Sequence, residues 1–189
     1  MLFGGANWRS MNCGKVIVSA NLAAAAMSEA DNYVDFEIRS AQTSDAPALA
    51  RLRYALRSST GVVTEPKADF LKRCTDWMEE HLKAGGYWQC WVAESEHKLI
   101  GCLWLQLVEK IPNPGSEPEY HAYLTNFYVE EFARGRGVGS EMLSRAIAWC
   151  ETREVHAVIL WPSARSRSLY ARRGFAVRDD LMELLIADA

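Results

Sequence analysis

The spacing of apolar residues predicts a succession of helices and strands that begins near residue 35. Leu49, Leu52 and Leu56 recur at helical intervals, and the apolar residues of 66–83 do the same. Shorter apolar runs, separated by glycines and polar turns, are typical of strands. The predicted strands are 35–40, 87–95, 99–108, 122–129, 157–161, 175–177 and 181–186, and two further helices are 139–152 and a short one around Tyr170. Residues 35–189 are therefore expected to form one α/β domain.

The first 34 residues differ from the rest of the chain in composition. They are rich in Ala, Ser, Asn and Gly and show little periodicity, which predicts a flexible N-terminal extension. An apolar run over 16–26 weakly resembles a signal peptide, but Ser19 and Asn21 interrupt it. The sequence from Met27 onward is more typical of a native start. Two interpretations stay open, a disordered extension and a misassigned start.

Charge is unevenly distributed along the chain. The chain has 189 residues and a formal net charge of −3. Residues 134–173 hold eight arginines and three glutamates, whereas the remainder holds 13 basic and 21 acidic residues. A local basic patch on an acidic chain indicates a small anionic ligand, because nucleic acid would need a broader basic face. No uninterrupted transmembrane run occurs, so neither nucleic acid nor a membrane is an expected partner.

The cysteines and histidines predict no metal site. The five cysteines lie far apart without a C-x-x-C pair, and the four histidines show no metal-ligand spacing. Reduced thiols are the ordinary state in the cytoplasm, which is the expected location.

A glycine-rich segment stands between a predicted strand and a predicted helix. It consists of Arg134, Gly135, Arg136, Gly137, Val138, Gly139 and Ser140. Such a turn exposes consecutive backbone N–H groups, and the dipole of the following helix adds to their positive field. Glycine keeps the backbone accessible to ligand oxygens, and some of these positions are expected to need a positive φ. Arg134 and Arg136 can donate to phosphate oxygens, so we interpret residues 134–140 as a pyrophosphate cradle.

Other phosphate-binding patterns fit the cradle less well. A Walker loop needs a Lys before the Ser, and Gly139 precedes Ser140. A dinucleotide fingerprint needs a third glycine where Ser140 stands. A glycine-rich turn without a ligand is the remaining alternative. The pattern that fits is Arg/Gln-x-x-Gly-x-Gly/Ala, with Arg134, Gly137 and Gly139 at its fixed positions.

This pattern resembles the coenzyme A loop of the GNAT superfamily of N-acetyltransferases. A second segment is similar to the Asn-x-x-Ala/Ser-x-x-x-Tyr-x-x-x-Gly-Phe motif of the same family, through Leu169-Tyr170 and Gly174-Phe175. Ser163 stands where the family usually has Asn, which weakens one expected contact to the pantetheine arm. Ser163 is also a suitable helix N-cap, and Gly174 a suitable C′ residue. The resemblance covers residues 36–186 and is strongest over 123–175.

The resemblance implies the acyl-CoA N-acyltransferase fold, in which helices flank a mixed central sheet that splays open at the coenzyme A site. It implies that the strand around Phe127 and Val129 pairs with pantetheine amides, and that Tyr170 protonates the leaving thiolate. Acetyl-CoA is then the cosubstrate, and a primary amine of a small molecule or peptide attacks it directly in a ternary complex. Dimers are frequent among relatives, so a homodimer is a further expectation. The alternative function is a catalytically degenerate coenzyme A-binding sensor or interaction module.

The sequence does not identify a general base. Many relatives carry a carboxylate six places before Val129, where this chain has Tyr123. Glu109, Glu119 and His121 are near in sequence and could act through water, or the amine could lose its proton to a water chain. A few acidic residues could attract a cationic acceptor, although solvated surface decoration is the favoured interpretation: Glu65, Asp69, Asp179 and Asp180.

Overall fold

The structure is a computed structural model that describes residues 35–186, apart from 60, 62, 84 and 85. The chain divides into two units, Met1–Asp35 and Phe36–Ala189, and every described helix and strand belongs to the second. The predicted extension, 1–34, lies outside the described residues. The elements, in chain order, are β1 (Glu37–Ser40), η1 (Thr43–Asp45), α2 (Ala46–Ser58), α3 (Lys67–Lys83), β2 (Trp88–Ser95), β3 (Lys98–Glu109), β4 (Tyr120–Val129), η2 (Glu131–Ala133), α4 (Val138–Thr152), β5 (Ala157–Ile159) and α5 (Arg167–Ala171).

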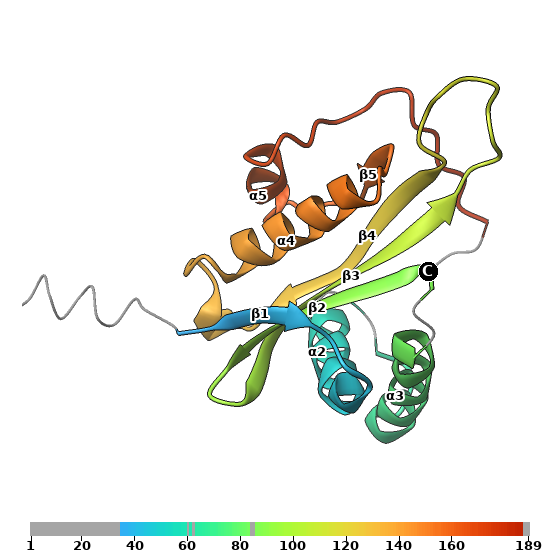
Figure 1. Cartoon of the computed structure of the whole chain (residues 1–189). Helices are drawn as coiled ribbons and strands as arrows, with labels where there is room; N and C mark the ends of the chain where they lie inside the picture. Colours follow the sequence, from blue (N-terminus) through green and yellow to red (C-terminus); the bar gives the residue numbers. More distant parts are fainter. Residues whose placement is uncertain (1–34, 60, 62, 84–85, 187–189) are drawn as a thin grey trace, which may run out of the picture. The chain divides into compact units, whose positions relative to one another are not determined.

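The five strands form one mixed sheet in the order β1-β2-β3-β4-β5. The pairs from β1 to β4 are antiparallel, and β5 runs parallel to β4. In Figure 1, α2 and α3 cover one face of the sheet, and α4 and α5 cover the other. The mixed sheet with flanking helices agrees with the predicted fold class.

Side-chain alternation along β3 explains how the sheet holds helices on both faces. Cys102 and Trp104 belong to a buried cluster with Leu49 of α2 and Met78 of α3. Leu103 is also fully buried, and its side chain points the opposite way because neighbouring residues of a strand alternate between faces. β3 is therefore apolar on both faces, as expected of a central strand covered on both sides.

The sheet opens between β4 and β5, as predicted. β5 pairs with β4 only through its residues opposite His121, Ala122 and Tyr123, whereas β4 continues to Val129. Residues 124–129 therefore extend beyond the ladder with β5. On its other edge β4 pairs with β3, where the register shifts beside Asn126, which has a left-handed φ of 47°.

The predicted strands 175–177 and 181–186 are wrong, because residues 175–186 form no regular element. The predicted strand 157–161 is also too long, and β5 ends at Ile159. Two features account for these corrections. A three-residue β5 offers a short ladder for pairing, and 181–186 is apolar on both faces, so as a strand it would need cover on both. Its apolar side chains are exposed instead, Met182 and Ile186 among them.

Candidate functional site

The cradle adopts the left-handed backbone that its glycines allow. Gly135 has a φ of 75° and Gly137 a φ of 87°, which other residue types rarely adopt. Gly137 is the N-cap of α4, so the turn leads directly into the helix. Gly139 lies inside α4, where a Cβ atom would come 3.5 Å from Phe127 Cζ. The predicted need for positive φ is therefore confirmed at Gly135 and Gly137.

The N-terminus of α4 presents uncapped backbone donors. Glu141 N–H is the first to bond within the helix, donating to the Gly137 carbonyl at 3.0 Å. Helix geometry leaves the N–H groups of Val138, Gly139 and Ser140 without intrahelical acceptors. Among the described residues, no side chain caps this end of α4. Three donors and the positive end of a 15-residue helix thus meet at one place, which is a suitable arrangement for an anion.

Arg134 anchors the start of the cradle to the end of β4. Its Nε donates to the Val129 carbonyl at 2.8 Å, and its Nη1 lies 2.9 Å from a carboxylate oxygen of Glu131. Its guanidinium also lies over the ring of Tyr128, 5.5 Å from the centroid. These contacts indicate a positioning role, and the phosphate contact expected of Arg134 stays a prediction. Arg136 is half-buried.

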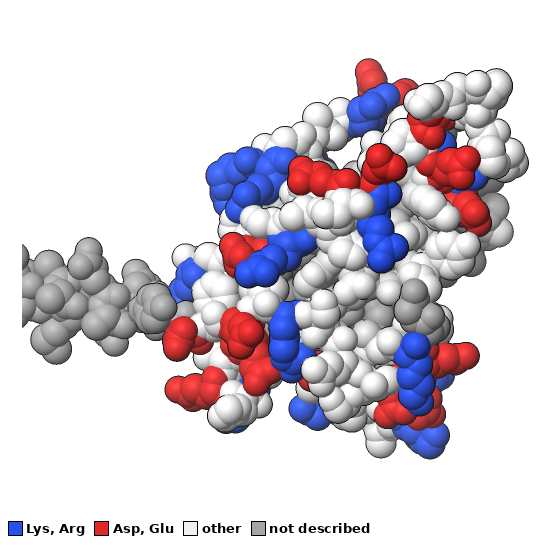
Figure 2. All heavy atoms as spheres, viewed as in Figure 1, with Lys and Arg blue, Asp and Glu red and all other residues white. Residues whose placement is uncertain are grey.

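Arg173 reaches the cradle from beyond the end of α5. Its Nη2 donates to the hydroxyl of Ser140 at 2.8 Å and lies 3.3 Å from the Ser140 carbonyl. Figure 2 shows basic side chains gathered over α5. The exposed arginines of this region are Arg165, Arg167, Arg172 and Arg173. In the sequence these arginines appear only as part of the basic stretch 134–173, and neither motif indicates that Arg173 belongs to the site.

Tyr170 is buried next to the strand that carries Phe127. The residue is 7% exposed, and its ring lies 6.3 Å from the Phe127 ring and 5.5 Å from the Phe175 ring. Burial raises the pKa of the Tyr170 hydroxyl to about 12, because an apolar environment disfavours the phenolate. The hydroxyl is thus held in the protonated form that a proton donor requires.

The turn after α5 is built as the sequence predicted. Gly174 has a φ of 87°, and its N–H bonds to the Ala171 carbonyl at 3.1 Å. Phe175 N–H bonds to the Tyr170 carbonyl at 3.2 Å, which completes a Schellman motif with Gly174 at C′. This motif holds Phe175 against Tyr170.

The predicted N-cap role of Ser163 is wrong, because the N-cap of α5 is Ser166. Ser163 stands three residues earlier, and its hydroxyl accepts the Ser166 N–H at 3.3 Å. Its Oγ also lies 2.9 Å from Ser166 Oγ. Ser163 therefore closes a polar turn ahead of the helix, and its predicted pantetheine contact stays a prediction.

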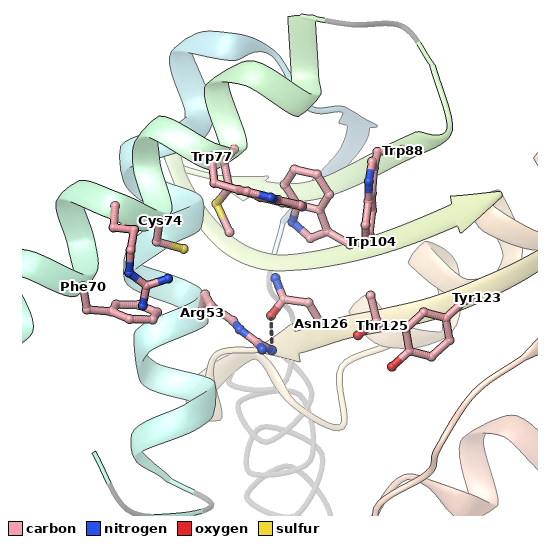
Figure 3. Close-up of a pocket in the computed structure, with 11 residues that line it drawn as sticks. Arg53, Phe70, Cys74, Trp77, Trp88, Trp104, Tyr123, Thr125 and Asn126 are labelled. Carbon is pink, nitrogen blue, oxygen red and sulfur yellow. Dashed lines mark hydrogen bonds between the residues drawn. The ribbon is translucent and has the colours of Figure 1, made fainter. Parts of the chain in front are cut away.

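The face of β4 that is turned toward α2 and α3 borders a cavity of about 680 Å³, which lies between these helices and the sheet. In Figure 3, Trp77, Trp88 and Trp104 lie along its upper side, and Arg53, Asn126 and Tyr123 along its lower side. The full lining comprises Arg53, Phe70, Arg73, Cys74, Trp77, Met78, Trp88, Trp104, Tyr123, Thr125 and Asn126. None of these stands out in the sequence as a site residue, because the aromatic stripe of α3 looks the same in an ordinary packed helix. Tyr123 is noted only because it stands where many relatives carry a carboxylate.

The carboxylates considered in the sequence analysis do not line this cavity. Glu65 pairs with Arg73 at 2.6 Å, and Glu109 accepts a hydrogen bond from Tyr87. His121 lies beside His156, with ring centroids 5.2 Å apart, and burial lowers its pKa. Asp180 pairs with its neighbour Arg178. Tyr123 does line the cavity, and its ring packs edge-on against Trp161 at 5.2 Å.

Comparison with known proteins identifies relatives of this arrangement. A sequence model of the Acetyltransferase (GNAT) family matches residues 51–175, which include the cradle, Tyr170 and the whole cavity lining. A comparison with curated protein sequences finds no match.

Solved structures share the fold over most of the chain. A predicted acetyltransferase from Clostridium acetobutylicum, solved with acetyl-CoA, is 26% identical with a TM-score of 0.68, over 80% of this chain and 97% of that one. A GCN5-related N-acetyltransferase from Ralstonia eutropha JMP134 is 25% identical with a TM-score of 0.67, over 81% and 100%. Glucosamine-6-phosphate N-acetyltransferase from Arabidopsis thaliana is 19% identical with a TM-score of 0.62, over 81% and 99%, a likeness that shows the fold alone.

None of the described helices is long and apolar enough to cross a membrane. In the same part of the chain, no cluster of three or more His, Cys, Asp or Glu side chains is suited to a metal ion.

Proposed function

The chain belongs to the acetyltransferase (GNAT) family, and on that premise we propose that it transfers an acetyl group from acetyl-CoA to a primary amine of a small molecule or peptide. The observation that carries the proposal is the uncapped N-terminus of α4, entered through Gly135 and Gly137 with left-handed φ. In the first turn of this helix, Gly139 lies next to Phe127 and Val129, which belong to the part of β4 beyond its ladder with β5.

The residues of the cradle fit a pyrophosphate. The N–H groups of Val138, Gly139 and Ser140 can donate to its oxygens, and a positive charge from Arg173 lies against Ser140. Because Gly137 has no side chain, ligand oxygens can approach this backbone closely. Arg134 holds the start of the cradle against β4 by donating a hydrogen bond to the Val129 carbonyl.

The adjacent part of β4 fits the pantetheine arm. Residues 124–129 lie beyond the ladder with β5, so their edge on that side can pair with amides of an extended ligand. Phe127 and Val129 lie closest to the cradle, since both would contact a Cβ placed at Gly139. The arm would then run between the diverging strands, with Ser163 near its path.

Tyr170 supplies the proton in the proposed reaction. The thioester provides an activated acetyl group and a thiolate leaving group when acetyl-CoA is bound. The amine must arrive neutral to attack, and the departing sulfur needs a proton. With a pKa of about 12, the Tyr170 hydroxyl is protonated at neutral pH and can donate to that sulfur. Its position beside Phe127 keeps it near the strand that would hold the pantetheine arm.

A second candidate function is a coenzyme A-binding module without transferase activity. The observation that favours it is the lining of the cavity, which includes no carboxylate among the described residues. A water chain can still remove the proton of an amine, so the transferase remains the main proposal.

We also propose a cytoplasmic location, since Cys74, Cys90, Cys102 and Cys150 are free thiols.

Two measurements separate the candidates. Calorimetry with acetyl-CoA tests binding, and a thiol-reactive dye measures release of free coenzyme A with a panel of amines. The transferase predicts binding together with amine-dependent thiol release. Binding without release for any amine would support the module, and absence of binding would contradict both candidates.

A further inference from the structure

The cavity under α2 and α3 has a wall of aromatic rings. Trp77 of α3 lies 5.2 Å from Trp88 and 5.6 Å from Trp104, centroid to centroid. Although these rings pack together, Trp77 is still 38% exposed. A volume of about 680 Å³ falls within the range of small-molecule sites. Indole rings facing such a space offer stacking and edge contacts to a flat apolar group (Figure 3).

Arg53 brings a positive charge to the opposite side of the same cavity. Its Nη1 donates to Asn126 Oδ1 at 3.4 Å, a long contact to a neutral acceptor. Among the described residues, no carboxylate forms an ion pair with Arg53. Burial lowers the pKa of this guanidinium, the direction expected where a charge lacks compensation, but arginine remains protonated. Leaving a partly buried cation without a partner of opposite charge is costly, so an anionic group is a suitable ligand for Arg53.

The second arginine of the lining does not supply a free charge. Arg73 lies 2.6 Å from a carboxylate oxygen of Glu65, and its guanidinium covers the ring of Phe70 at 5.6 Å. The charge of Arg73 is therefore balanced by the protein itself, which leaves Arg53 as the cation that an occupant of the cavity would meet.

The cavity and the predicted pantetheine groove share strand β4. Thr125 and Asn126 line the cavity, while Phe127 and Val129 lie beside Gly139 on the cradle side. The left-handed bulge residue Asn126 marks the point where the two sites are closest along the strand. A molecule in the cavity is thus well located to present its amine to the opening between β4 and β5.

We infer that the acceptor is an aromatic or flat apolar amine that carries a carboxylate, bound with its body against Trp77 and Trp88 and its carboxylate on Arg53. This inference rests on the proposed function and specifies its substrate class. An acceptor with several positive charges is disfavoured, because Arg53 repels a second cation. The same repulsion favours the neutral form of the amine, which is the form that attacks.

The test uses probes without an amine, so that binding is measured apart from turnover. Indole-3-acetate, indole-3-acetamide and hexanoate are titrated into the full chain and followed by saturation-transfer NMR. Indole-3-acetate is expected to bind roughly tenfold more tightly than the amide, since a hydrogen bond to a charged partner adds this much or more. It should also bind more tightly than hexanoate, which lacks the ring.

Variants assign the preference to residues. Arg53→Gln should remove the preference for acid over amide, and Arg53→Lys should keep part of it. Arg51→Gln is the matched control, because Arg51 is an exposed arginine of the same helix outside the cavity lining. It should leave the preference unchanged. Trp77→Ala should weaken the acid and the amide alike while leaving hexanoate nearly unaffected.

Several results would overturn the inference: no binding of indole-3-acetate, equal affinity for acid and amide, or an acid preference that survives in Arg53→Gln. Calorimetry with acetyl-CoA and the thiol-release assay, run on the same protein, report separately on the proposed function. If these succeed while the acid preference is absent, only the substrate class is wrong.

Discussion

The two faces of β4 carry candidate sites that are built in different ways. On the side of α4 and α5, the site consists mainly of backbone groups, held by left-handed φ at Gly135 and Gly137. On the side of α2 and α3, the cavity consists of side chains, with three tryptophans and Arg53 contributed by four different elements. One strand therefore separates a site defined by local conformation from one defined by tertiary packing.

This difference shows why the two sites can vary independently. The cradle consists of seven consecutive residues, 134–140, so most of its backbone geometry depends on one short segment. The cavity gathers residues from Arg53 to Asn126, and its chemistry can be altered by changing single side chains without touching the cradle. This difference predicts that cosubstrate defects and acceptor defects separate cleanly. The cradle variants below, compared with the Arg53 and Trp77 variants described above, test that separation.

The largest effect is expected for Tyr170→Phe. The change removes the proton donor but keeps the ring that packs on Phe127 and Phe175. General acid catalysis contributes roughly 10²–10⁴-fold, so kcat should fall by about that factor, while KM for acetyl-CoA should move little. Steady-state kinetics under conditions where chemistry limits the rate measure both constants. A kcat close to that of the wild type would show that water or another group supplies the proton.

A binding defect on the cradle side is expected for Gly137→Trp. Its φ of 87° strains any other residue, at a cost of roughly 1–2 kcal/mol, and the indole would fill the path to the backbone donors. Nothing lies within 4 Å of a Cβ at this position, so the fold should survive. We expect acetyl-CoA affinity to drop by about 100-fold or more in calorimetry, which corresponds to about 2.7 kcal/mol.

Gly61→Trp is the control for that variant. Gly61 also has open space around its Cβ position and does not have a left-handed φ. It should bind acetyl-CoA as the wild type does. Unchanged affinity in Gly137→Trp would contradict the cradle, and equal losses in both variants would point to a general effect of the added indole.

A smaller effect is expected for Arg134→Gln, which sharpens the role of the cradle's first residue. The change removes the Nε bond to Val129 and the pair with Glu131, so unfolding free energy should fall by about 1 kcal/mol. Acetyl-CoA affinity should fall by about tenfold, because the cradle loses its anchor. Thermal melts and calorimetry measure the two quantities. An affinity loss without a stability loss would instead indicate the direct phosphate contact.

Arg145→Gln is the matched control, since Arg145 forms an exposed pair with Glu141 on the same helix that the cradle leads into. Such a pair contributes only about 0.3–0.5 kcal/mol. Both stability and acetyl-CoA affinity should remain close to the wild-type values.

The sequence predicted those features whose cause is local. Positive φ at Gly137 and the C′ position of Gly174 follow from the conformational freedom of glycine, and both are confirmed. The strands after α5 were wrong because pairing depends on the length of a distant partner, and β5 has only three residues. The cavity could not be predicted, since Arg53 and Asn126 are 73 positions apart and only folding brings them together.

The smallest effect concerns the pH dependence of kcat and tests whether burial raises the pKa of the Tyr170 hydroxyl. A tyrosine of ordinary pKa, 10.0, would start to lose its proton above about pH 9, and kcat would decline there. With the pKa raised to about 12, the neutral hydroxyl persists through that range. The sign follows from burial, which disfavours the phenolate and shifts any loss of activity to higher pH.

We therefore expect the kcat profiles of the wild type and Tyr170→Phe to run parallel from about pH 7 to pH 10.5, separated by a constant factor. Rates measured in overlapping buffers of constant ionic strength give this comparison directly. A wild-type decline centred near pH 10 that is absent from Tyr170→Phe would mean that solvent reaches the hydroxyl. In that case the tyrosine would retain its catalytic role, but the cradle side of β4 would be more open to water than its packing indicates.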